Sequence, residues 1–293
     1  MPEGLVVKAY GGYFFVYHEG TIRQCTIRGR LKTRGRVVVG DRVVLRALSG
    51  GRGVIEEVRP RRSELRRPPI ANANRVLVVI AFRDPAPSLN LLDRILVHCE
   101  AAGISAVICV NKADLADSGE LQSPWLRVYL DAGYPTYITS AVTGLGVSEL
   151  RESLLGRVTV LAGPSGAGKS SLVNAVQPGL ALRTGEISRK LKRGRHITRH
   201  VELLPLDGGG WVADTPGFSA LSLDGITREE LAGLFPELRR QARPCRFTDC
   251  LHYQEPDCGV RQAVAAGAVA RSRYAHYLGF LREIMVREEK RKP

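Results

Sequence analysis

A glycine-rich stretch in the middle of the chain has the residue types needed to hold phosphate groups. Residues 163–170 read Gly-Pro-Ser-Gly-Ala-Gly-Lys-Ser and fit the pattern G-x-x-x-x-G-K-[ST], between a predicted strand (158–162) and a predicted helix (169–176). The glycines let the backbone wrap the phosphates, so that amide N–H groups meet negative charge. We expect Lys169 to reach the terminal phosphates and the Ser170 hydroxyl to bind Mg²⁺. The predicted phosphate contacts are Gly163, Pro164, Ser165, Gly166, Ala167, Gly168, Lys169, Ser170 and Ser171.

Two further segments favour guanine over adenine. Residues 111–114 read Asn-Lys-Ala-Asp and follow an apolar run at 106–110, where the ligand loops of a parallel sheet belong. The Asp114 carboxylate can accept hydrogen bonds from the ring N–H and the 2-amino group of guanine, and adenine offers neither. Residues 139–141, Thr-Ser-Ala, follow a predicted strand (134–138) and resemble a loop whose backbone meets the guanine carbonyl. The predicted base contacts are Asn111, Lys112, Asp114, Ser140 and Ala141.

A fourth segment, Asp-Thr-Pro-Gly at 214–217, follows the predicted strand 211–214. Asp214 could hold Mg²⁺ through water, and the Gly217 amide could meet the γ-phosphate. Together the four segments resemble the motifs of GTPases, although here the Asn-Lys-Ala-Asp and Thr-Ser-Ala segments precede the phosphate loop. Circular permutation moves the termini of a domain without moving its site. We therefore expect a circularly permuted GTPase domain.

A second kind of site is indicated by cysteines and a histidine near the end of the chain. The spacing Cys245-x₄-Cys250-x-His252-x₅-Cys258 supplies three thiolates and one imidazole within fourteen residues. Four such ligands suit tetrahedral Zn²⁺, and they leave no position open for water. We therefore expect one structural zinc ion per chain and no catalysis by this metal.

The elements that must position these residues fall into three predicted domains. Residues 1–68 hold five short β-branched or aromatic runs separated by glycine turns, which suit a small barrel of the oligonucleotide-binding (OB) type. Residues 69–231 alternate apolar runs with helical stretches, as in an α/β domain with a mostly parallel sheet. Residues 232–293 are expected to be helical apart from the cysteine cluster. The candidate strands of the barrel lie at 4–10, 12–18, 21–28, 42–48 and 53–58.

The charge of the chain is unevenly distributed. The net charge is +14, and it divides into +9 for residues 1–68, zero for 69–231 and +5 for 232–293. Two basic ends around a neutral middle predict a polyanionic partner, although basic residues can also serve only to solubilise a surface. No run of 18 apolar residues and no secretory signal is present, so we expect a cytoplasmic, monomeric protein that does not bind membranes.

At this level the chain resembles the ribosome small-subunit-dependent GTPases, the RsgA or YjeQ family. The resemblance rests on the permuted order of motifs, the barrel-like start and the terminal Cys/His cluster, and it covers nearly the whole chain. It extends to RGRLK (28–32), VGDRV (39–43), RPPIANANRVLVV (67–79), LLDRILV (91–97) and GKSSLVNA (168–175). The resemblance implies a GTP hydrolase that binds the small ribosomal subunit and its rRNA, acts in late subunit maturation and is stimulated by the subunit.

The same resemblance implies how hydrolysis is assisted. Many GTPases orient water with a glutamine after the D-x-x-G motif, and that position here is Phe218. The segment 189–200 has six basic residues and two histidines, and it resembles the family's switch. His196 matches the catalytic histidine and Thr198 the magnesium-binding threonine, while Ile197 replaces the first threonine of that switch. The implied catalytic residues are His196, Lys169 and Thr198.

Alternative interpretations remain at this stage. By residue type alone, His196 could be a surface histidine in an RNA-binding loop. Phe218 is also compatible with an rRNA chaperone whose GTPase domain only senses guanine nucleotides. A P-loop kinase for a small molecule is a third possibility, but Asp114 and the lack of an acceptor-binding domain argue against it.

Overall fold

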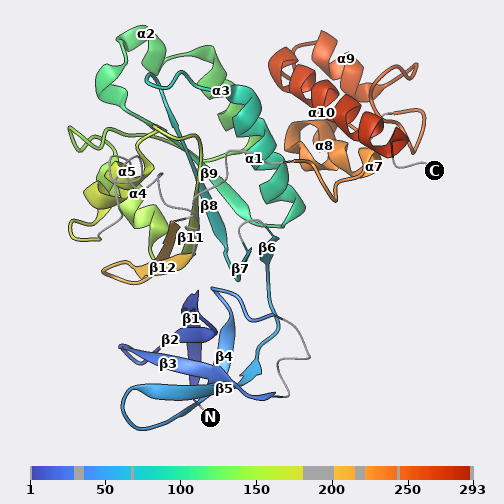
Figure 1. The fold of residues 1–293 in the computed structure, drawn as a ribbon. Coiled ribbons are helices and arrows are strands. Elements are labelled where there is room, and N and C mark those ends of the chain that lie inside the picture. The colour runs from blue at the N-terminus through green and yellow to red at the C-terminus, as the bar shows by residue number, and fades with distance from the viewer. Residues whose placement is uncertain are drawn as a thin grey trace.

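The computed structural model describes residues 2–29, 36–66, 69–180, 201–214, 222–242 and 245–290. The first part of the chain forms a five-stranded barrel (Figure 1). Its strands run in the order β1-β2-β3-β5-β4, and β4 pairs with β1 to close the cylinder around Val6, Val16 and Ile55. The predicted barrel is therefore confirmed. The strands are β1 (Glu3–Tyr10), β2 (Tyr13–His18), β3 (Thr21–Ile27), β4 (Arg42–Ala47) and β5 (Arg52–Val58).

A six-stranded sheet forms the middle of the molecule. The order is β10-β9-β8-β11-β13-β12, in which the first five strands are parallel and β12 is antiparallel to β13. This arrangement confirms the predicted α/β domain. The strands are β8 (Arg75–Ala81), β9 (Ser105–Asn111), β10 (Thr136–Ile138), β11 (Val158–Ala162), β12 (Glu202–Pro205) and β13 (Trp211–Asp214).

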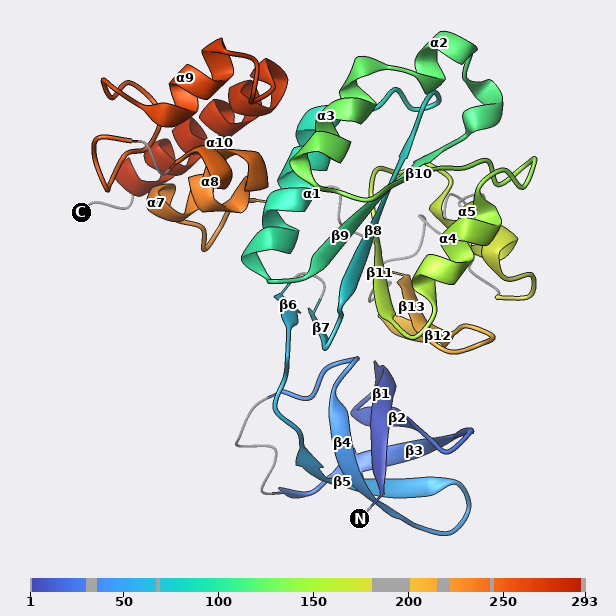
Figure 2. The same cartoon turned by 180° about the vertical axis from the view of Figure 1, so that it is seen from behind.

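Helices cover both faces of this sheet, because its central strands are apolar on both sides. On β8, Val76, Val78 and Ile80 pack toward one face, and Leu77 and Val79 pack toward the other. The first face is covered by α1 (Leu89–Ala101) and α3 (Pro124–Ala132), and the second by α4 (Val147–Leu154) and α5 (Lys169–Val176) (Figure 2). A 3₁₀ turn (Ala113–Leu115) and α2 (Ser118–Leu121) lie between β9 and α3.

The barrel is joined to this sheet at the amino-terminal ends of the parallel strands (Figure 1). β1 pairs with β12 at Lys8 and Glu202, whose side chains form an ion pair at 2.9 Å. The connecting segment contains a short hairpin, β6 (Glu64–Arg66) and β7 (Pro69–Ala71), and Val39 bridges to Ile70 within it.

The last part of the chain packs against α1 (Figures 1 and 2). A core around Phe235, Tyr277 and Phe280 includes Val97 of α1, which ties this helical unit to the sheet domain. Within the described ranges, no helix is long and apolar enough to cross a bilayer. The helical elements are α7 (Arg228–Leu231), a 3₁₀ turn (Ala232–Leu234), α8 (Pro236–Gln241), α9 (Gly259–Ala265) and α10 (Arg271–Glu289).

Candidate nucleotide and metal sites

The phosphate loop connects the carboxyl end of β11 to the first turn of α5, as its sequence predicts. Two of its glycines are required by their surroundings. Gly163 has φ +124°, and a Cβ there would collide with the carbonyl oxygen of Val79. Gly168 has φ +86°, and its Cβ would collide with the side-chain amide of Asn111. The loop is therefore packed directly against β8 and the end of β9, which only glycine permits.

Asn111 joins the three loops that the sequence assigns to the nucleotide. Its side chain is 1% exposed, and its Nδ2 donates to the carbonyl of Ala167 in the phosphate loop at 3.0 Å. Its Oδ1 accepts from the Ala141 amide and from the Thr139 hydroxyl, both at 3.3 Å. These contacts position the loops and leave the side chain little capacity for a base. Sequence reasoning missed Thr139 as a support, which the polar residue at the buried end of a strand could have signalled.

Asp114 and Ser140 lie together, although they are 26 residues apart in sequence. The Ser140 hydroxyl donates to the Asp114 carboxylate and accepts from the amides of Val142 and Thr143, at 3.2 and 3.1 Å. Ser140 is fully buried and Asp114 is exposed. Ser140 therefore orients a carboxylate that remains open to accept hydrogen bonds from a base.

Two lysines lie at this edge of the sheet. The Lys169 ammonium donates to the carbonyls of Gly163 and Pro164, at 3.0 and 2.7 Å, and thus folds over its own loop. Lys112 has φ +62°, and its ammonium donates to the carbonyl of Asp84. Both cations therefore lie beside the loop that would receive the phosphates.

The remaining predicted nucleotide residues divide into two groups. Ser165, Gly166 and Ser171 are exposed on the phosphate loop and the start of α5, while Pro164 and Ser170 are partly buried. The backbone of Asp214 ends β13, at the same edge of the sheet as the phosphate loop. Three predicted residues, His196, Thr198 and Gly217, lie outside the described residues, as do Ile197 and Phe218.

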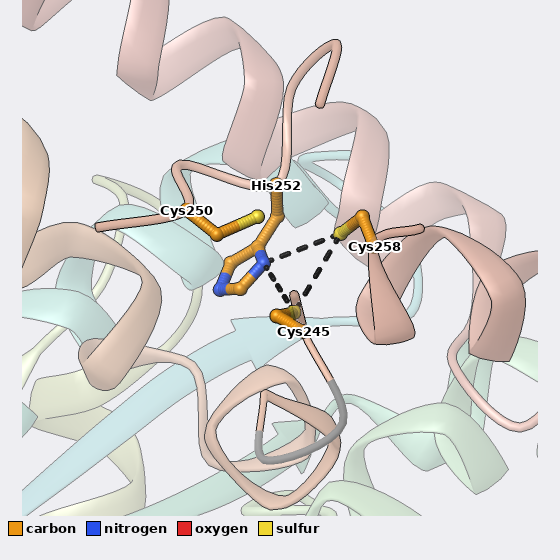
Figure 3. A group of neighbouring side chains, drawn as sticks. All are labelled: Cys245, Cys250, His252 and Cys258. Atoms are coloured by element: carbon orange, nitrogen blue, oxygen red, sulfur yellow. Dashed lines mark hydrogen bonds between the residues drawn. The ribbon is translucent and has the colours of Figure 1, made fainter. Parts of the chain in front are cut away.

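The Cys/His cluster is assembled as its spacing predicts, within a loop that precedes α9 (Figure 3). One ligand atom from each of Cys245, Cys250, His252 and Cys258 lies within 4.8 Å of the others. The distance from His252 Nδ1 is 3.5 Å to the Cys245 sulfur and 3.3 Å to the Cys258 sulfur, and the two sulfurs are 3.9 Å apart. A tetrahedral zinc site has edges of about 3.5 Å between sulfur and nitrogen and about 3.8 Å between sulfurs. The four groups therefore fit a zinc ion.

The pKa values of the cluster determine how it would take up a cation. Burial raises the pKa of the Cys250 thiol to about 12 and also raises that of Cys258. The imidazole of His252 is 4% exposed, and burial lowers its pKa, so it is neutral and can act as a ligand. A divalent cation that binds here must displace thiol protons, which makes its affinity pH-dependent.

The loop around this cluster is held by residues that sequence reasoning missed. The Glu255 carboxylate accepts from the amides of Leu251 and Tyr253, both at 2.8 Å, and of Gln254 at 3.1 Å. Burial would raise the pKa of Glu255, but these amides hold it below the ordinary value. The Tyr274 hydroxyl on α10 donates to the His252 carbonyl at 2.7 Å. An acidic residue inside a short ligand loop could have signalled this support, because the loop's amides need acceptors.

Comparison with known protein families agrees with this architecture. Residues 58–224 match the model of the RsgA GTPase, and residues 3–55 match that of the RsgA N-terminal domain. A Moorella thermoacetica protein named "Small ribosomal subunit biogenesis GTPase RsgA" is 50% identical over 98% of this chain and 98% of its own length. A protein of the same name from Geobacillus thermodenitrificans is 47% identical, over 98% of this chain and 99% of its own.

Solved structures match along nearly the whole chain. YjeQ from Thermotoga maritima superposes with a TM-score of 0.86 at 37% identity, and the match covers 97% of this chain and 98% of that one. YloQ, described as a circularly permuted GTPase, superposes with a TM-score of 0.83 at 38% identity, covering 100% and 96%. The second match confirms the permuted order of motifs that the sequence predicts.

Proposed function

The chain belongs to the RsgA GTPase family, and from this premise we propose that it is a GTP-hydrolysing switch in the biogenesis of the small ribosomal subunit. The observation that carries the proposal is that the Asn111 side chain contacts both the phosphate loop and the Thr-Ser-Ala loop, and so brings three sequence motifs together. A relative that matches nearly the whole chain is named "Small ribosomal subunit biogenesis GTPase RsgA". The finer parts of the proposal are the roles of single residues, the contact with rRNA and the stimulation of turnover by the subunit.

We assign guanine to the pocket edge formed by Asp114, Ser140 and Ala141. The exposed carboxylate of Asp114, oriented by Ser140, would accept from the two guanine N–H groups, and the backbone of the loop at Ser140 and Ala141 would meet the guanine carbonyl. Adenine would leave the carboxylate without a donor, so selectivity comes from an unpaired polar group. The Asn111 side chain supports this edge of the guanine pocket through its contact with Ala141, and Lys112 lies beside it.

The phosphates are assigned to residues 163–171, where backbone amides and the Lys169 ammonium face the incoming charge. Ser170, Thr198 and, through water, Asp214 would hold the Mg²⁺ ion that GTPases use, with the Gly217 amide at the γ-phosphate. The metal supplies charge stabilisation for the phosphoryl group.

We propose that contact with the small subunit orients the basic segment 189–200 and brings His196 to the attacking water. Phe218 cannot orient that water, so hydrolysis is slow until the histidine is supplied. GTP and GDP would favour different positions of segment 189–200, which would make binding to rRNA depend on the nucleotide.

We assign rRNA binding and zinc binding to the two end domains of the chain, with domain boundaries at 1–68, 69–231 and 232–293. The barrel carries a net charge of +9 and the last domain +5. We therefore expect both end domains to bind rRNA, while the GTPase domain between them is neutral. The Cys/His cluster would hold one zinc ion that fixes the fold of the last domain, since all four positions are filled by protein ligands.

The experiment is GTP turnover with and without purified small subunits. We expect the subunits to raise the turnover of the unmodified chain, and we expect His196→Ala to bind GTP normally but to lose about 10²-fold of the stimulated rate. Arg195→Ala is the matched control, because it removes a neighbouring charge and leaves the imidazole. Full stimulation of His196→Ala would exclude the histidine from catalysis. A lack of stimulation of the unmodified chain would instead favour a nucleotide-sensing rRNA chaperone.

A further inference from the structure

A cavity of about 340 Å³ lies where the barrel meets the sheet. Its walls include Arg42 from the barrel, Arg62 from the connecting segment and Arg157 just before β11, together with Asn74 and Trp211. Among the described residues that line it, there is no aspartate or glutamate. We call it the seam pocket. It lies at the amino-terminal ends of β8, β11 and β13, whereas the nucleotide loops lie at their carboxyl ends, so the two sites are separate.

A partly buried ion pair places two of the three arginines. Asp41 is fully buried, and its carboxylate accepts from the Arg61 guanidinium at 2.8 and 3.0 Å and from the Val38 amide at 2.8 Å. Arg42 and Arg62 are the residues that directly follow the two members of this pair. Because the pair fixes both backbones, it presents the two flanking side chains to the same cavity.

Asn72 also links the segment around Asp41 to the segment around Arg61. Its Nδ2 donates to the Gly40 carbonyl and its Oδ1 accepts from the Arg62 amide, both at 2.9 Å. Its φ of +55° belongs to the left-handed region, which asparagine tolerates better than most residues. The Asn74 carboxamide in turn accepts from the Val158 amide at 3.0 Å, next to Arg157. The Asn-Ala-Asn segment at 72–74 thus holds the walls of the seam pocket together.

The positive charge of the pocket is not neutralised within the structure. Across the described parts of the chain, Arg42, Arg62 and Arg157 form no ion pair with a carboxylate, whereas Arg59 and Arg61 nearby each have two acidic partners. Burial lowers the pKa of Arg75, and the charge of Arg157 lowers it further. Three solvent-exposed arginines that line one cavity, with no acidic partner among the described residues, are a favourable environment for an anion.

We propose that the seam pocket binds a phosphate group, the chemistry shared by a phosphodiester of an RNA strand and by a small phosphorylated molecule. Guanidinium groups match phosphate oxygens in geometry as well as in charge. The cavity is at the lower end of the range of about 300–1,000 Å³ that ligand pockets occupy, which suits one nucleotide unit. The partly buried indole of Trp211, packed edge-on against Tyr17 at 4.9 Å, offers an apolar wall beside the phosphate.

The test uses the full chain saturated with GDP and Mg²⁺, so that the phosphate loop is filled. The probes are inorganic pyrophosphate, followed by calorimetry, and a fluorescein-labelled six-nucleotide RNA, followed by anisotropy. The pocket variant combines Arg42→Gln, Arg62→Gln and Arg157→Gln. The matched control combines three exposed arginines that do not line the pocket and loses the same charge: Arg52→Gln, Arg127→Gln and Arg151→Gln. GDP affinity and melting temperature report whether each variant is folded.

We expect the pocket variant to lose at least about tenfold in affinity for a probe that the matched control still binds. If the ligand is RNA, the salt dependence of RNA binding should also become less steep, by about 2 in log–log slope for three lost contacts. Loss of pyrophosphate binding with unchanged RNA binding would identify a small phosphorylated ligand. The proposal is overturned if both triple variants bind both probes equally. Because the pocket lies away from the nucleotide loops, that outcome would leave the proposed GTPase function intact.

Discussion

At the scale of single residues, His98 is an ionisable group whose buried environment disfavours its charged form. It lies near the end of α1, and its Nε2 is buried and lacks a hydrogen-bond partner among the residues that the structure describes. Burial lowers its pKa, and the nearby charge of Arg94 lowers it too, while a hydrogen bond with the Ser222 backbone and the charge of Asp224 act in the opposite direction. The folded chain therefore keeps this imidazole neutral at a pH at which the unfolded chain protonates it.

This difference predicts a dependence of stability on pH. As the pH falls through the ordinary histidine value of about 6.5, the unfolded state takes up a proton that the folded state resists, so the free energy of unfolding decreases. The loss cannot exceed about 1.4 kcal/mol per pH unit for one proton. Urea unfolding of the unmodified chain and of His98→Gln at pH 7.5 and 5.5 measures it. We expect the variant to lose less stability over this interval, and equal losses would contradict the argument.

The nucleotide loops show what can be predicted for individual residues. The types and spacing of Asn111, Asp114 and Lys169 are sufficient to predict a site for a guanine nucleotide. Their separate roles are not predictable from the motifs. Asn111 hydrogen-bonds to Ala167, which is 56 residues away, and therefore supports the loops, while Ser140 donates a hydrogen bond to Asp114 and orients its carboxylate. Those contacts depend on which strands are neighbours in the sheet, and that information is not contained in a motif.

At the scale of elements, the loop that carries the Cys/His cluster has little regular structure of its own. It precedes a helix of only seven residues, α9, and its backbone is fixed by Glu255 and Tyr274. A metal ion would add four bonds to this loop, so we expect its removal to destabilise the last domain strongly.

Metal content and thermal unfolding test this prediction. We expect one zinc ion per freshly purified chain, and we expect Cys250→Ser to lose most of the metal and to melt at a lower temperature. Asp249→Asn is the control, because it changes the exposed neighbour of a ligand and leaves all four ligands in place. Zinc-free unchelated protein, or equal zinc contents in the two variants, would refute the assignment.

The elements that sequence predicts best are those with a clear apolar pattern. The strands of the barrel and the buried strands β8, β9, β11 and β13 follow from alternation or from continuous apolar runs. The short strands β6, β7 and β12 are not predicted, because polar residues or proline interrupt their few apolar residues. β12 also depends on a partner distant in sequence, since Glu202 forms an ion pair with Lys8 across 194 residues.

At the scale of the whole molecule, a buried charge network joins the GTPase domain to the last domain. Arg273 of α10 is 1% exposed, and its guanidinium donates to Asp93 of α1 at 2.6 Å and to Glu237 of α8 at 2.6 and 3.1 Å. Asp93 also accepts from Tyr129 at 2.7 Å and contacts His276. Sequence analysis does not predict this network, since Asp93 and Arg273 are 180 residues apart and each resembles a surface residue of its helix.

Arg273→Met should therefore uncouple the two domains at a large cost in stability. It leaves the carboxylates of Asp93 and Glu237 buried without their cation, and breaking a buried pair in this way costs about 3–5 kcal/mol. Arg271→Met, an exposed change two residues earlier on α10, should stay within about 0.5 kcal/mol of the unmodified chain. Urea unfolding of the unmodified chain and of the two variants at pH 7.5 measures these differences in the free energy of unfolding. A loss for Arg273→Met that is no larger than the loss for Arg271→Met would show that this network does not hold the two domains together.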